Sequence, residues 1–448
     1  MTRTRTRISP SASSAVRRVT PTRLDLARGE SRVIVAMGPV ATPPVTDLSS
    51  ELVRMAWISG GNRLGIVRTA AGCEWSLDPN RLAQAVRDWS VDFPGTDHLP
   101  IQEKLALLHA SLSTPSGLRV YIAGDYFITD IPHAVFDGVM VVQLWLYLTS
   151  WKRDVTPQWA EAPEIEPHLV TALMRYVATH PRALVGLTRA TVRRPPSAPP
   201  LGELRPVDES PPVTGDPDES RWCTRSARLS ADRLTEIGRW RDVYAPHCSG
   251  AVILMAVLTR AMRAAEIPLA PHIHVVVDGR RYDTRLRNYL GNAAVGINLP
   301  FSQPYSPDAL QTELSAAIAS GRPLAAMLAS SFGQWMSLRR RRARANPAEP
   351  MTPDVGTVLS FSHLLGLDTM PDGHWIGGFD AHVFGALTEP VDERGIAILM
   401  PKMRDHYDLS ASFNLRHHST ESVDTALRMA TDDPVTLLES GHADHGEP

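Results

Sequence analysis

The segment 132–138, Pro-His-Ala-Val-Phe-Asp-Gly, holds residue types that can carry out acid–base chemistry. An imidazole with a pKa of about 6.5 can take a proton from a hydroxyl or an amine at neutral pH, and His133 supplies one. Asp137 can fix the turn that follows by capping a helix or by forming an ion pair, and Gly138 permits a close approach of the backbone. Taken alone, a histidine and an aspartate at this spacing fit a structural role as well as a catalytic one.

The segment lies between two predicted strands and a predicted helix. Residues 117–133 have the composition of two strands joined by a tight turn at Gly124-Asp125. Residues 139–151 are apolar on nearly every side, which predicts a largely buried helix. We therefore expect His133 at the end of a strand, where a rigid backbone can direct the imidazole into a cleft.

Three further segments have the apolar spacing of helices. Residues 77–89 would begin with Asp78 as the N-cap, and residues 229–244 with Ser230 in the same position. Residues 249–265 predict a more buried helix. Short strands are expected at 272–277, 292–299, 355–363, 395–400 and 408–415. In the last of these strands apolar and polar residues alternate, which predicts one buried face.

The chain divides at a proline-rich stretch. Residues 195–217 contain eight prolines, which lack the N–H group that helices and central strands require. Each half is expected to be an α/β unit of the two-layer α+β type, with strands grouped rather than alternating with helices. The predicted organisation is a disordered arm (1–22), an N-terminal lobe (23–190), a Pro-rich linker (191–220), a C-terminal lobe (221–435) and a flexible tail (436–448).

The composition excludes several classes of protein. The 448 residues are 43% hydrophobic and 21% charged, close to globular averages, so the chain is not wholly disordered. No apolar run reaches the roughly 18 residues of a membrane span, and no apolar stretch follows the basic N-terminus as a secretory signal requires. Three cysteines cannot form a disulfide framework, so we expect a reducing, cytoplasmic location.

The charge balance argues against two kinds of partner. A net charge of −2 is too balanced for bulk attraction to nucleic acid or to an anionic membrane. Of the 46 basic residues, only Lys104, Lys152 and Lys402 are lysines. Because arginine is so strongly preferred, an arginine cluster is weak evidence for a site in this chain.

The His-x-x-x-Asp-Gly core resembles that of the coenzyme-A-dependent acyltransferase superfamily. This superfamily includes chloramphenicol acetyltransferase, wax ester synthases, polyketide-associated acyltransferases and the condensation domains of peptide synthetases. Its hallmark is His-His-x-x-x-Asp-Gly at a strand-to-helix junction. His133, Asp137 and Gly138 match the second histidine, the aspartate and the glycine, whereas Pro132 replaces the first histidine.

Three stretches of the second half also resemble this superfamily, in the same order along the chain. Residues 247–264 resemble a helix that begins with Thr-Val-Asn-Asp, with Ser249 in place of the threonine. Residues 274–300 resemble a family segment that consists of a strand, an arginine, Leu-Gly-Asn and a second strand. Arg280 matches the arginine and Asn292 matches the asparagine of that segment. Residues 358–366 resemble the strand that ends in Ser-Asn-Val-Pro-Gly, and Ser362 matches its serine.

The resemblance implies two chloramphenicol-acetyltransferase-like lobes that form a pseudo-dimer around a central tunnel. It implies His133 as the general base of acyl transfer from a thioester to a hydroxyl, without a covalent acyl-enzyme. Ser362, with Ser360 on the same strand face, would stabilise the oxyanion or contact substrate, and Asn292 would contact substrate. Arg280, or else Arg281, would form an ion pair with Asp137 as structural support.

The partners implied are a small-molecule acceptor and a donor that is either acyl-coenzyme A or an acyl carrier protein. The acyl-CoA or acyl-phosphopantetheine is a co-substrate, and no permanently bound cofactor is expected. By analogy the pathway would be one of specialised metabolism or lipid synthesis. Two lobes in one chain make a monomeric active site possible.

Several alternatives stay open. The protein could be a free-standing condensation enzyme that takes its donor from a carrier protein and forms an ester or an amide. It could also be a degenerate homologue that binds a ligand without catalysis, or an enzyme whose cleft serves another reaction such as a cyclisation. Pro132 and the altered Thr-Val-Asn-Asp and Ser-Asn-Val-Pro-Gly stretches favour the degenerate homologue, and the retained His133, Asp137 and Gly138 oppose it.

Other clusters are interpreted as ordinary surface or core residues. The arginines of 339–344 could hold a coenzyme A phosphate or an acidic carrier protein, but the arginine preference of the chain favours a solvated helix end or loop. His272 and His274 share a strand face without a third ligand nearby in sequence, and the pairs at 417–418 and 442/445 are no stronger. No metal site is expected. Gly60-Gly61 and Gly377-Gly378 fit no nucleotide-binding loop.

Overall fold

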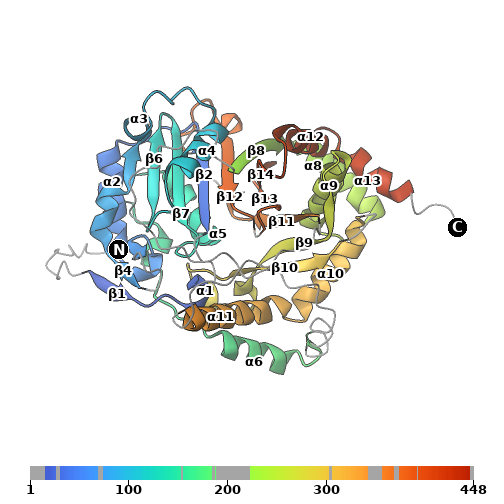
Figure 1. Ribbon diagram of the computed structural model, residues 1–448, viewed down its shortest axis with the longest axis horizontal. Helices are drawn as coiled ribbons and strands as arrows, with labels where there is room; N and C mark the ends of the chain where they lie inside the picture. The colour runs from blue at the N-terminus through green and yellow to red at the C-terminus, as the bar shows by residue number, and fades with distance from the viewer. Residues whose placement is uncertain are drawn as a thin grey trace, which may run out of the picture.

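Two β-sheets stand side by side in the molecule, and a layer of helices runs below both of them (Figure 1). The structure is a computed structural model that describes residues 16–26, 31–68, 74–152, 155–183, 187, 222–301, 305–341, 356–367, 373–390 and 392–443. For residues 332–341 and 441–443 it describes the backbone alone. The expected linker of residues 191–220 lies outside the described residues.

The N-terminal lobe is built on a sheet of strand order β12-β2-β7-β6-β5. Its strands are β2 (Arg32–Gly38), β5 (Val86–Asp88), β6 (Arg119–Ala123), β7 (Tyr126–Pro132) and β12 (Val383–Thr388). Only β5 runs parallel to its neighbour, because it reaches β6 through a longer connection; the other pairs are antiparallel.

Both faces of this sheet are buried. Ile34 and Ile128 pack with Leu105 of α4 (Ile101–Ser111) on one face. On the other face, Val35 and Phe127 pack with α2 (Val45–Ala56) and α5 (Gly138–Thr149). Because successive side chains of a strand point to opposite faces, this arrangement requires the near-continuous apolar runs of β2 and β7.

A small sheet and a short 3₁₀ helix correct two expectations. Residues 1–22 were expected to form a disordered arm. Residues 1–15 lie outside the described residues, but β1 (Arg17–Val19) pairs with β4 (Trp75–Leu77), which also pairs with β3 (Ile66–Arg68). Residues 77–89 were expected to form one helix, but they form η2 (Pro79–Gln84) and β5, followed by α3 (Trp89–Asp92). Pairing of Val86 with Val120 at the sheet edge outweighs the local helical spacing.

The C-terminal lobe has a sheet of strand order β10-β9-β11-β13-β14-β8. The bounds are β8 (Trp222–Leu229), β9 (Leu269–Asp278), β10 (Ala294–Pro300), β11 (Thr357–Leu364), β13 (Ile396–Pro401) and β14 (Tyr407–Asn414). One face packs on α8 (Ala231–Tyr244), α9 (Gly250–Ala264), α10 (Pro307–Ala319) and α12 (Thr420–Asp432) around a single apolar core. The strands and the helices α8 and α9 thus agree with the sequence expectation, including Ser230 as the N-cap of α8.

The opposite face of this sheet is polar and is turned toward the N-terminal lobe. Strand β14 was expected to have one buried face, but Ser410 and Ser412 on its polar side are also completely buried. Their hydroxyl groups bond to the backbone of β12, which lies across them. Strand β12 follows β11 in the chain yet extends the sheet of the N-terminal lobe, so the two lobes do not separate at the proline-rich stretch (Figure 1).

Helices α11 (Arg322–Arg341), α6 (Leu169–Thr179) and the short α1 (Arg23–Leu26) form the layer below the sheets (Figure 1). Leu24, Leu169 and Leu324 bring these helices together in a small core of their own. The tail after residue 436 was expected to be flexible, but α13 (Pro434–Ala443) continues through its first part and buries Leu438. The remaining short helices are η1 (Gly60–Asn62), η3 (Gln158–Glu161), η5 (Gly279–Tyr282), η6 (Thr284–Leu286) and η8 (Phe379–Ala381).

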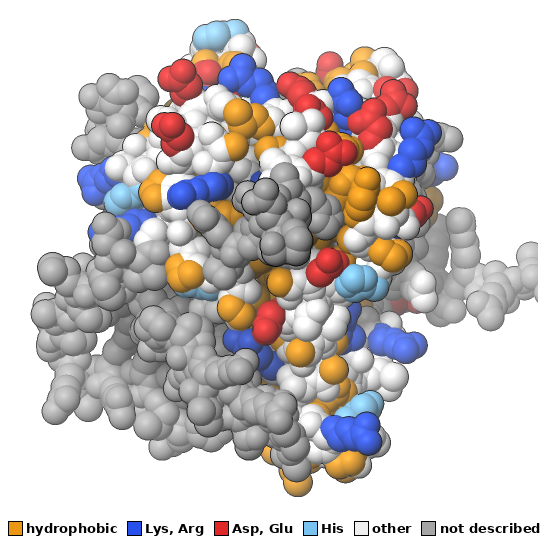
Figure 2. All heavy atoms as spheres, turned by 90° about the vertical axis from the view of Figure 1, so that its right-hand side faces the viewer, with side chains coloured by type: hydrophobic (Ala, Val, Ile, Leu, Met, Phe, Trp, Pro, Cys, Tyr) orange, Lys and Arg blue, Asp and Glu red, His pale blue; other side chains and the backbone are white. Residues whose placement is uncertain are grey.

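The face shown in Figure 2 carries acidic and basic side chains interspersed with apolar ones, in keeping with the balanced net charge. Among the described residues, none of the helices is both long and apolar enough to cross a membrane.

Candidate functional site

His133 directly follows β7, and α5 begins five residues later at Gly138, as the sequence predicts. Strand β7 lies between β2 and β6 and is buried along nearly its whole length. The backbone N–H of His133 continues the ladder with a 2.8 Å bond to the carbonyl of Ser31. The histidine therefore leaves the sheet from a backbone that is fixed on both sides.

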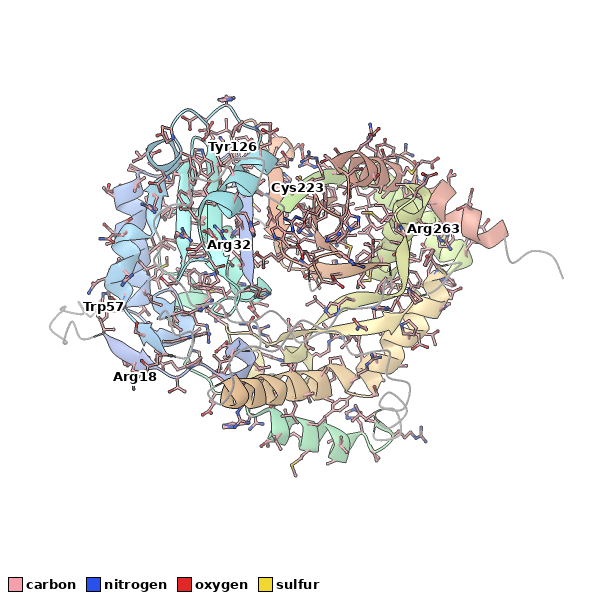
Figure 3. All side chains as sticks on the ribbon, viewed as in Figure 1. Arg18, Arg32, Trp57, Tyr126, Cys223 and Arg263 are labelled. Carbon is pink, nitrogen blue, oxygen red and sulfur yellow. The ribbon has the colours of Figure 1, made fainter. Side chains whose placement is uncertain are left out.

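A buried ion pair anchors β7 just before the motif. Arg32 of β2 binds both carboxylate oxygens of Asp130, at 2.7 and 2.9 Å, and both side chains are almost fully buried. The same guanidinium donates to the carbonyls of Leu108, His109 and Leu112 at the C-terminal end of α4. Carbonyls at the C-terminal end of a helix need partners from outside it, so Arg32, which Figure 3 labels, joins α4 to the sheet.

The imidazole of His133 is oriented by the loop that follows it. Its Nδ1 lies 2.9 Å from the backbone carbonyl of Phe136, and the side chain is half-buried. A carbonyl oxygen can only accept, so Nδ1 carries the proton of the neutral ring. The basic lone pair is consequently on Nε2, the nitrogen that points away from the loop.

Every backbone carbonyl from position 132 to position 137 accepts a hydrogen bond. Those of Pro132 and Asp137 are bonded within the loop and the first turn of α5, and that of Phe136 accepts from the His133 ring. The remaining three are bound by side chains from outside the loop. A loop whose carbonyls are all hydrogen-bonded has little freedom to move, so the position of His133 is well fixed.

The ion pair expected between Asp137 and Arg280 is present and buried, with 2.5 Å between Nη2 and Oδ2. Asp137 also caps α5, because its Oδ1 accepts from the N–H groups of Val139 and Met140. Burial raises the pKa of Asp137, while Arg280 and the Met140 N–H act in the opposite direction. Burial lowers the pKa of Arg280, but Asp137 and Asp278 raise it above its usual value.

Arg280 does more than neutralise Asp137. Its guanidinium also donates to the carbonyls of Tyr289 and Gly291, at 2.7 to 2.9 Å. Since Arg280 belongs to the C-terminal half and Asp137 to the N-terminal half, this pair joins the motif to the second lobe.

Asn292 supports the motif loop from the same side. It was expected to contact substrate, but its Nδ2 donates to the carbonyls of His133 and Ala134, at 2.9 and 2.7 Å, and the residue is only 1% exposed. Both amide donors are therefore used on the backbone that carries the imidazole. The preceding Gly291 is required by packing, because a Cβ there would lie 2.3 Å from the hydroxyl of Tyr289.

Sequence reasoning missed Arg63 and Asp25. Arg63 donates to the carbonyl of Val135 at 2.7 Å and forms a buried ion pair with Asp25 at 3.0 Å. Burial lowers the pKa of Arg63, but the Asp25 carboxylate raises it above the usual value. The one local signal was that Arg63 follows Gly60-Gly61; nothing in the sequence connects it to Asp25, which lies 38 positions earlier.

Ser360 and Ser362 lie on the face of β11 that is turned away from the core of the C-terminal lobe. Leu359 and Phe361 of the same strand belong to that core, so the alternating serines face the N-terminal lobe. Leu364 lies on the same face of β11 as the two serines. A Cβ added at Gly138 would lie 3.1 Å from the side chain of Leu364. Ser362 is thus two positions from a residue that contacts the start of α5.

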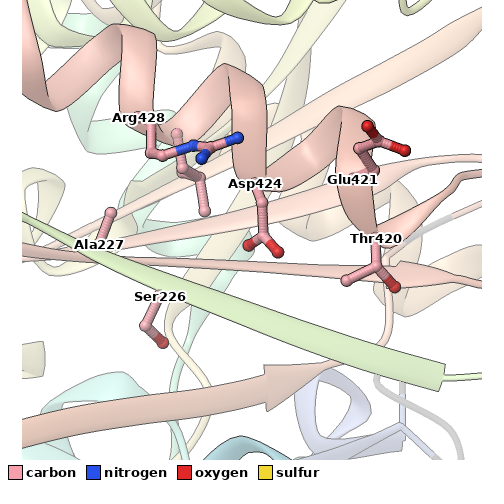
Figure 4. Close-up of a pocket in the computed structure, with 7 residues that line it drawn as sticks. Ser226, Ala227, Thr420, Glu421, Asp424 and Arg428 are labelled. Atoms are coloured by element: carbon pink, nitrogen blue, oxygen red, sulfur yellow. The ribbon is translucent and has the colours of Figure 1, made fainter.

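A pocket between β8 and α12 has no place in this chemistry. It is lined by Ser226, Ala227, Thr420, Glu421, Asp424, Leu427 and Arg428 (Figure 4). The lining holds no histidine, and one of its two carboxylates, Asp424, is bound to Arg225 at 3.2 Å. It lies on the C-terminal lobe, away from the motif loop.

Comparison with known proteins was informative only for structures, since no protein-family model and no curated protein matches the sequence. TRI3 trichothecene 15-O-acetyltransferase from Fusarium sporotrichioides superposes with a TM-score of 0.56 at 12% identity, over 96% of this chain and 97% of that one. The first condensation domain of the calcium-dependent antibiotic synthetase gives 0.54 at 14% identity, over 95% and 97%. The peptide synthetase FmoA3 gives 0.52 at 16%, over 95% of this chain and 43% of that one.

The protein has the two-lobed condensation-domain fold. The α/β class, the pair of lobes and the resemblance to this superfamily are confirmed at the level of the fold. Within the condensation-domain fold, His133, Asp137, Gly138, Arg280 and Asn292 come together around one loop. Ser360 and Ser362 lie on the sheet that faces this loop, and the central tunnel stays a prediction.

The structure also describes part of the arginine run and several of the paired histidines. Residues 339–341 end α11, while Arg342 and Arg344 lie outside the described residues. His274 Nδ1 donates a 2.8 Å bond to Oδ1 of Asn298 on the neighbouring strand, and burial lowers the pKa of His272. His418 binds the carbonyl of Arg394, which fits its interpretation as an ordinary core residue.

Proposed function

We propose that this protein is an acyltransferase that moves an acyl group from a thioester to the hydroxyl of a small molecule. The single observation that carries the proposal is the bond between His133 Nδ1 and the Phe136 carbonyl, at 2.9 Å. It makes Nε2 the basic nitrogen of an imidazole that is fixed at the junction of the two lobes. A general base needs both that lone pair and that fixed direction.

The reaction would use His133 twice. Nε2 takes the proton of the acceptor hydroxyl as its oxygen attacks the thioester carbonyl, which gives a tetrahedral intermediate. When the intermediate collapses, the C–S bond breaks and the imidazolium returns the proton to the departing thiolate. The proton and both electron pairs are accounted for, so neither a resident cofactor nor an acyl-enzyme is needed.

Ser362 is our candidate for stabilising the oxyanion of that intermediate. It is half-buried on the strand face that reaches the start of α5 through Leu364. A hydroxyl about 3 Å from the developing negative charge would contribute about 3 kcal/mol to transition-state stabilisation. Ser360, two residues earlier on the same face, would then line the site without touching the reacting carbonyl.

The donor would be acyl-coenzyme A or a phosphopantetheine-bound acyl group, in a pathway of specialised metabolism or lipid synthesis. Structures with the same fold include an O-acetyltransferase and a condensation domain, which supports acyl transfer in general. The likeness to a condensation domain supports a second candidate function. In this alternative, the protein is a free-standing enzyme that takes its donor from a carrier protein and acylates an amine.

The test is thiol release from a panel of acyl-coenzyme A thioesters of increasing chain length, measured without an acceptor. Transfer to water should be slow but detectable, and His133→Ala should abolish it while the melting midpoint stays the same. His374→Ala, which changes an exposed histidine, is the matched control. Ser362→Ala should slow release by roughly 100-fold, and Ser360→Ala should not.

Equal release by wild type and His133→Ala would refute the general base. If no thioester of coenzyme A reacts, the same variants are compared on acyl-phosphopantetheine carried by a carrier protein. Failure of that second panel as well would leave a binding protein without acyl transfer activity.

A further inference from the structure

A second cluster of titratable side chains, unrelated to the motif loop, lies where β12 and β14 begin. It consists of His382, His406 and Asp408, whose ligand atoms all lie within 4.8 Å of one another. All three residues are buried, His382 with 1% and His406 and Asp408 with 4% of their surface exposed. The proposed function uses none of them.

The other such group among the described residues is a weaker candidate. His247, Cys248 and Asp308 lie close together, but His247 is exposed. Burial and the neighbouring Asp308 raise the pKa of the Cys248 thiol to about 12, so the thiol stays protonated and binds metal poorly.

Both imidazoles of the buried cluster are fixed in one tautomer. His382 Nδ1 lies 2.5 Å from the carbonyl of Phe379, and His406 Nδ1 lies 2.8 Å from Oδ1 of Asp405. A carbonyl and an ionised carboxylate only accept, so each Nδ1 carries the proton of its neutral ring.

The two Nε2 atoms consequently face each other as acceptors, 3.4 Å apart. Oδ2 of Asp408 comes within 2.7 Å of His382 Nε2, and Oδ1 lies 3.7 Å from His406 Nε2. Three acceptors that converge in a buried place repel one another unless a positive charge lies among them. The guanidinium of Arg228 lies at the edge of the cluster, against Oδ1 of Asp408 and 3.3 Å from His382 Nε2. The charge between the two Nε2 atoms themselves is either an extra proton or a metal ion.

The separation of the two Nε2 atoms, 3.4 Å, suits a metal ion, whereas the 2.7 Å from His382 Nε2 to Oδ2 of Asp408 would have to lengthen on binding. Two nitrogen ligands of a tetrahedral zinc ion, each bound at about 2.0–2.1 Å, are about 3.3 Å apart, close to the separation of the Nε2 atoms. Ligating histidines usually donate their other ring N–H to a carboxylate or a backbone carbonyl, and the partners of His382 and His406 are one of each. Imidazole and carboxylate together suit zinc rather than calcium or magnesium.

Arg228 completes the surroundings. Its Nε donates to Oδ1 of Asp408 at 2.9 Å, and its Nη2 donates to the carbonyl of His382 at 2.6 Å. The bond from Arg228 occupies Oδ1 of Asp408, so Oδ2 is the oxygen that can bind the ion. Nη2 also lies 3.3 Å from His382 Nε2, a long contact that metal binding would replace.

We propose that His382 Nε2, His406 Nε2 and a carboxylate oxygen of Asp408 bind a divalent transition metal, zinc in the first place, with water as the fourth ligand. The sequence predicts no metal site, because His382 is 24 positions from His406 and no short ligand spacing marks the pair. His382 directly precedes β12 of the N-terminal sheet, and His406 directly precedes β14 of the C-terminal sheet. The ion would therefore hold the two sheets together where β12 crosses.

The experiment uses the full chain, stripped of metal with a chelator and then titrated with Co²⁺. We expect about one Co²⁺ per chain with the visible absorption of a tetrahedral site, loss of that absorption when Zn²⁺ is added, and a higher melting midpoint with either metal. Asp405→Asn changes an exposed side chain, so the fold is preserved, and should weaken binding by about 10- to 100-fold. His406→Gln should abolish it.

His247→Ala is the control, because it disrupts the other candidate group and should leave binding unchanged. The proposal is overturned if wild type shows neither the absorption nor the change in melting midpoint, since a proton then holds the cluster together. It is equally overturned if His406→Gln binds Co²⁺ as tightly as wild type. Both readouts are independent of acyl transfer.

Discussion

At the scale of single residues, the motif loop is held by side chains that do no chemistry themselves. Arg63 reaches it from the N-terminal lobe, and Arg280 and Asn292 reach it from the C-terminal lobe. The resemblance predicted Arg280 as structural support and Asn292 as a substrate contact, but it did not point to Arg63. The bonds of Arg63 and Asn292 to backbone carbonyls leave no pattern in a sequence. A role that depends on carbonyl contacts can be found only once the fold is known.

Asn292 gives the sharpest test of this support. Asn292→Asp has the same shape but replaces both N–H donors with an oxygen, which faces the carbonyls of His133 and Ala134. We expect thiol release to fall strongly, because the imidazole loses its fixed direction, and the free energy of unfolding to fall by about 1–3 kcal/mol. Urea unfolding and thiol release are the measurements. Normal release by Asn292→Asp would mean that the loop needs no support from Asn292.

Removing the buried ion pair between Asp137 and Arg280 should lower the free energy of unfolding more than any other change to the motif loop. Asp137→Ala leaves the buried guanidinium without its carboxylate and α5 without its cap, so we expect the free energy of unfolding to fall by roughly 3 kcal/mol. The double variant with Arg280→Met should be less destabilised than the sum of the single changes, because no buried charge is left alone. Glu439→Ala, on an exposed site of α13, is the control. An unchanged urea midpoint for Asp137→Ala would contradict the structural role.

At the scale of elements, the sequence predicted those whose local signals agree with their tertiary surroundings. Helices α8 and α9 have caps, apolar spacing and a core-facing side that all point to the same structure. It failed for residues 77–89, where Val86 leaves the helical pattern to pair with β6. It failed also for β14, whose serines read as a solvent face but are buried by β12. Both errors come from a partner that is distant in the chain.

Strand β12 lies at the edge of its sheet and has a neighbouring strand on one side only. On the other side, serine hydroxyls of β14 bond to its backbone. The N–H and the carbonyl of Ala386 point away from β2, and the hydroxyls of Ser410 and Thr224 bond to them. Ser410→Val would leave the Ala386 N–H buried without a partner, so we expect the free energy of unfolding to fall by about 1–3 kcal/mol. Ser50→Ala, at an exposed serine of α2, should change it little. A stability equal to that of wild type would show that β12 does not depend on these hydroxyls.

At the scale of the whole molecule, the two halves of the sequence are not two independent domains. Strand β12 comes from the second half and pairs along β2 of the first. The Asp137–Arg280 pair and the Asn292 bonds cross the same boundary. The proline-rich stretch lies outside the described residues, so its role as a linker stays a prediction, and composition could not show that a strand of the second half returns to the first sheet.

A cut in the chain tests this dependence. A protease site placed within residues 195–217, outside the described residues, would divide the protein into two fragments after folding. We expect the fragments to elute together from a sizing column and to melt near the midpoint of the intact chain, because the β2–β12 ladder and the buried ion pair remain. Fragments that separate without denaturant would show that the lobes fold as independent units. In that case His133 would lose the support of Arg280 and Asn292 on separation, and thiol release should end at the same time.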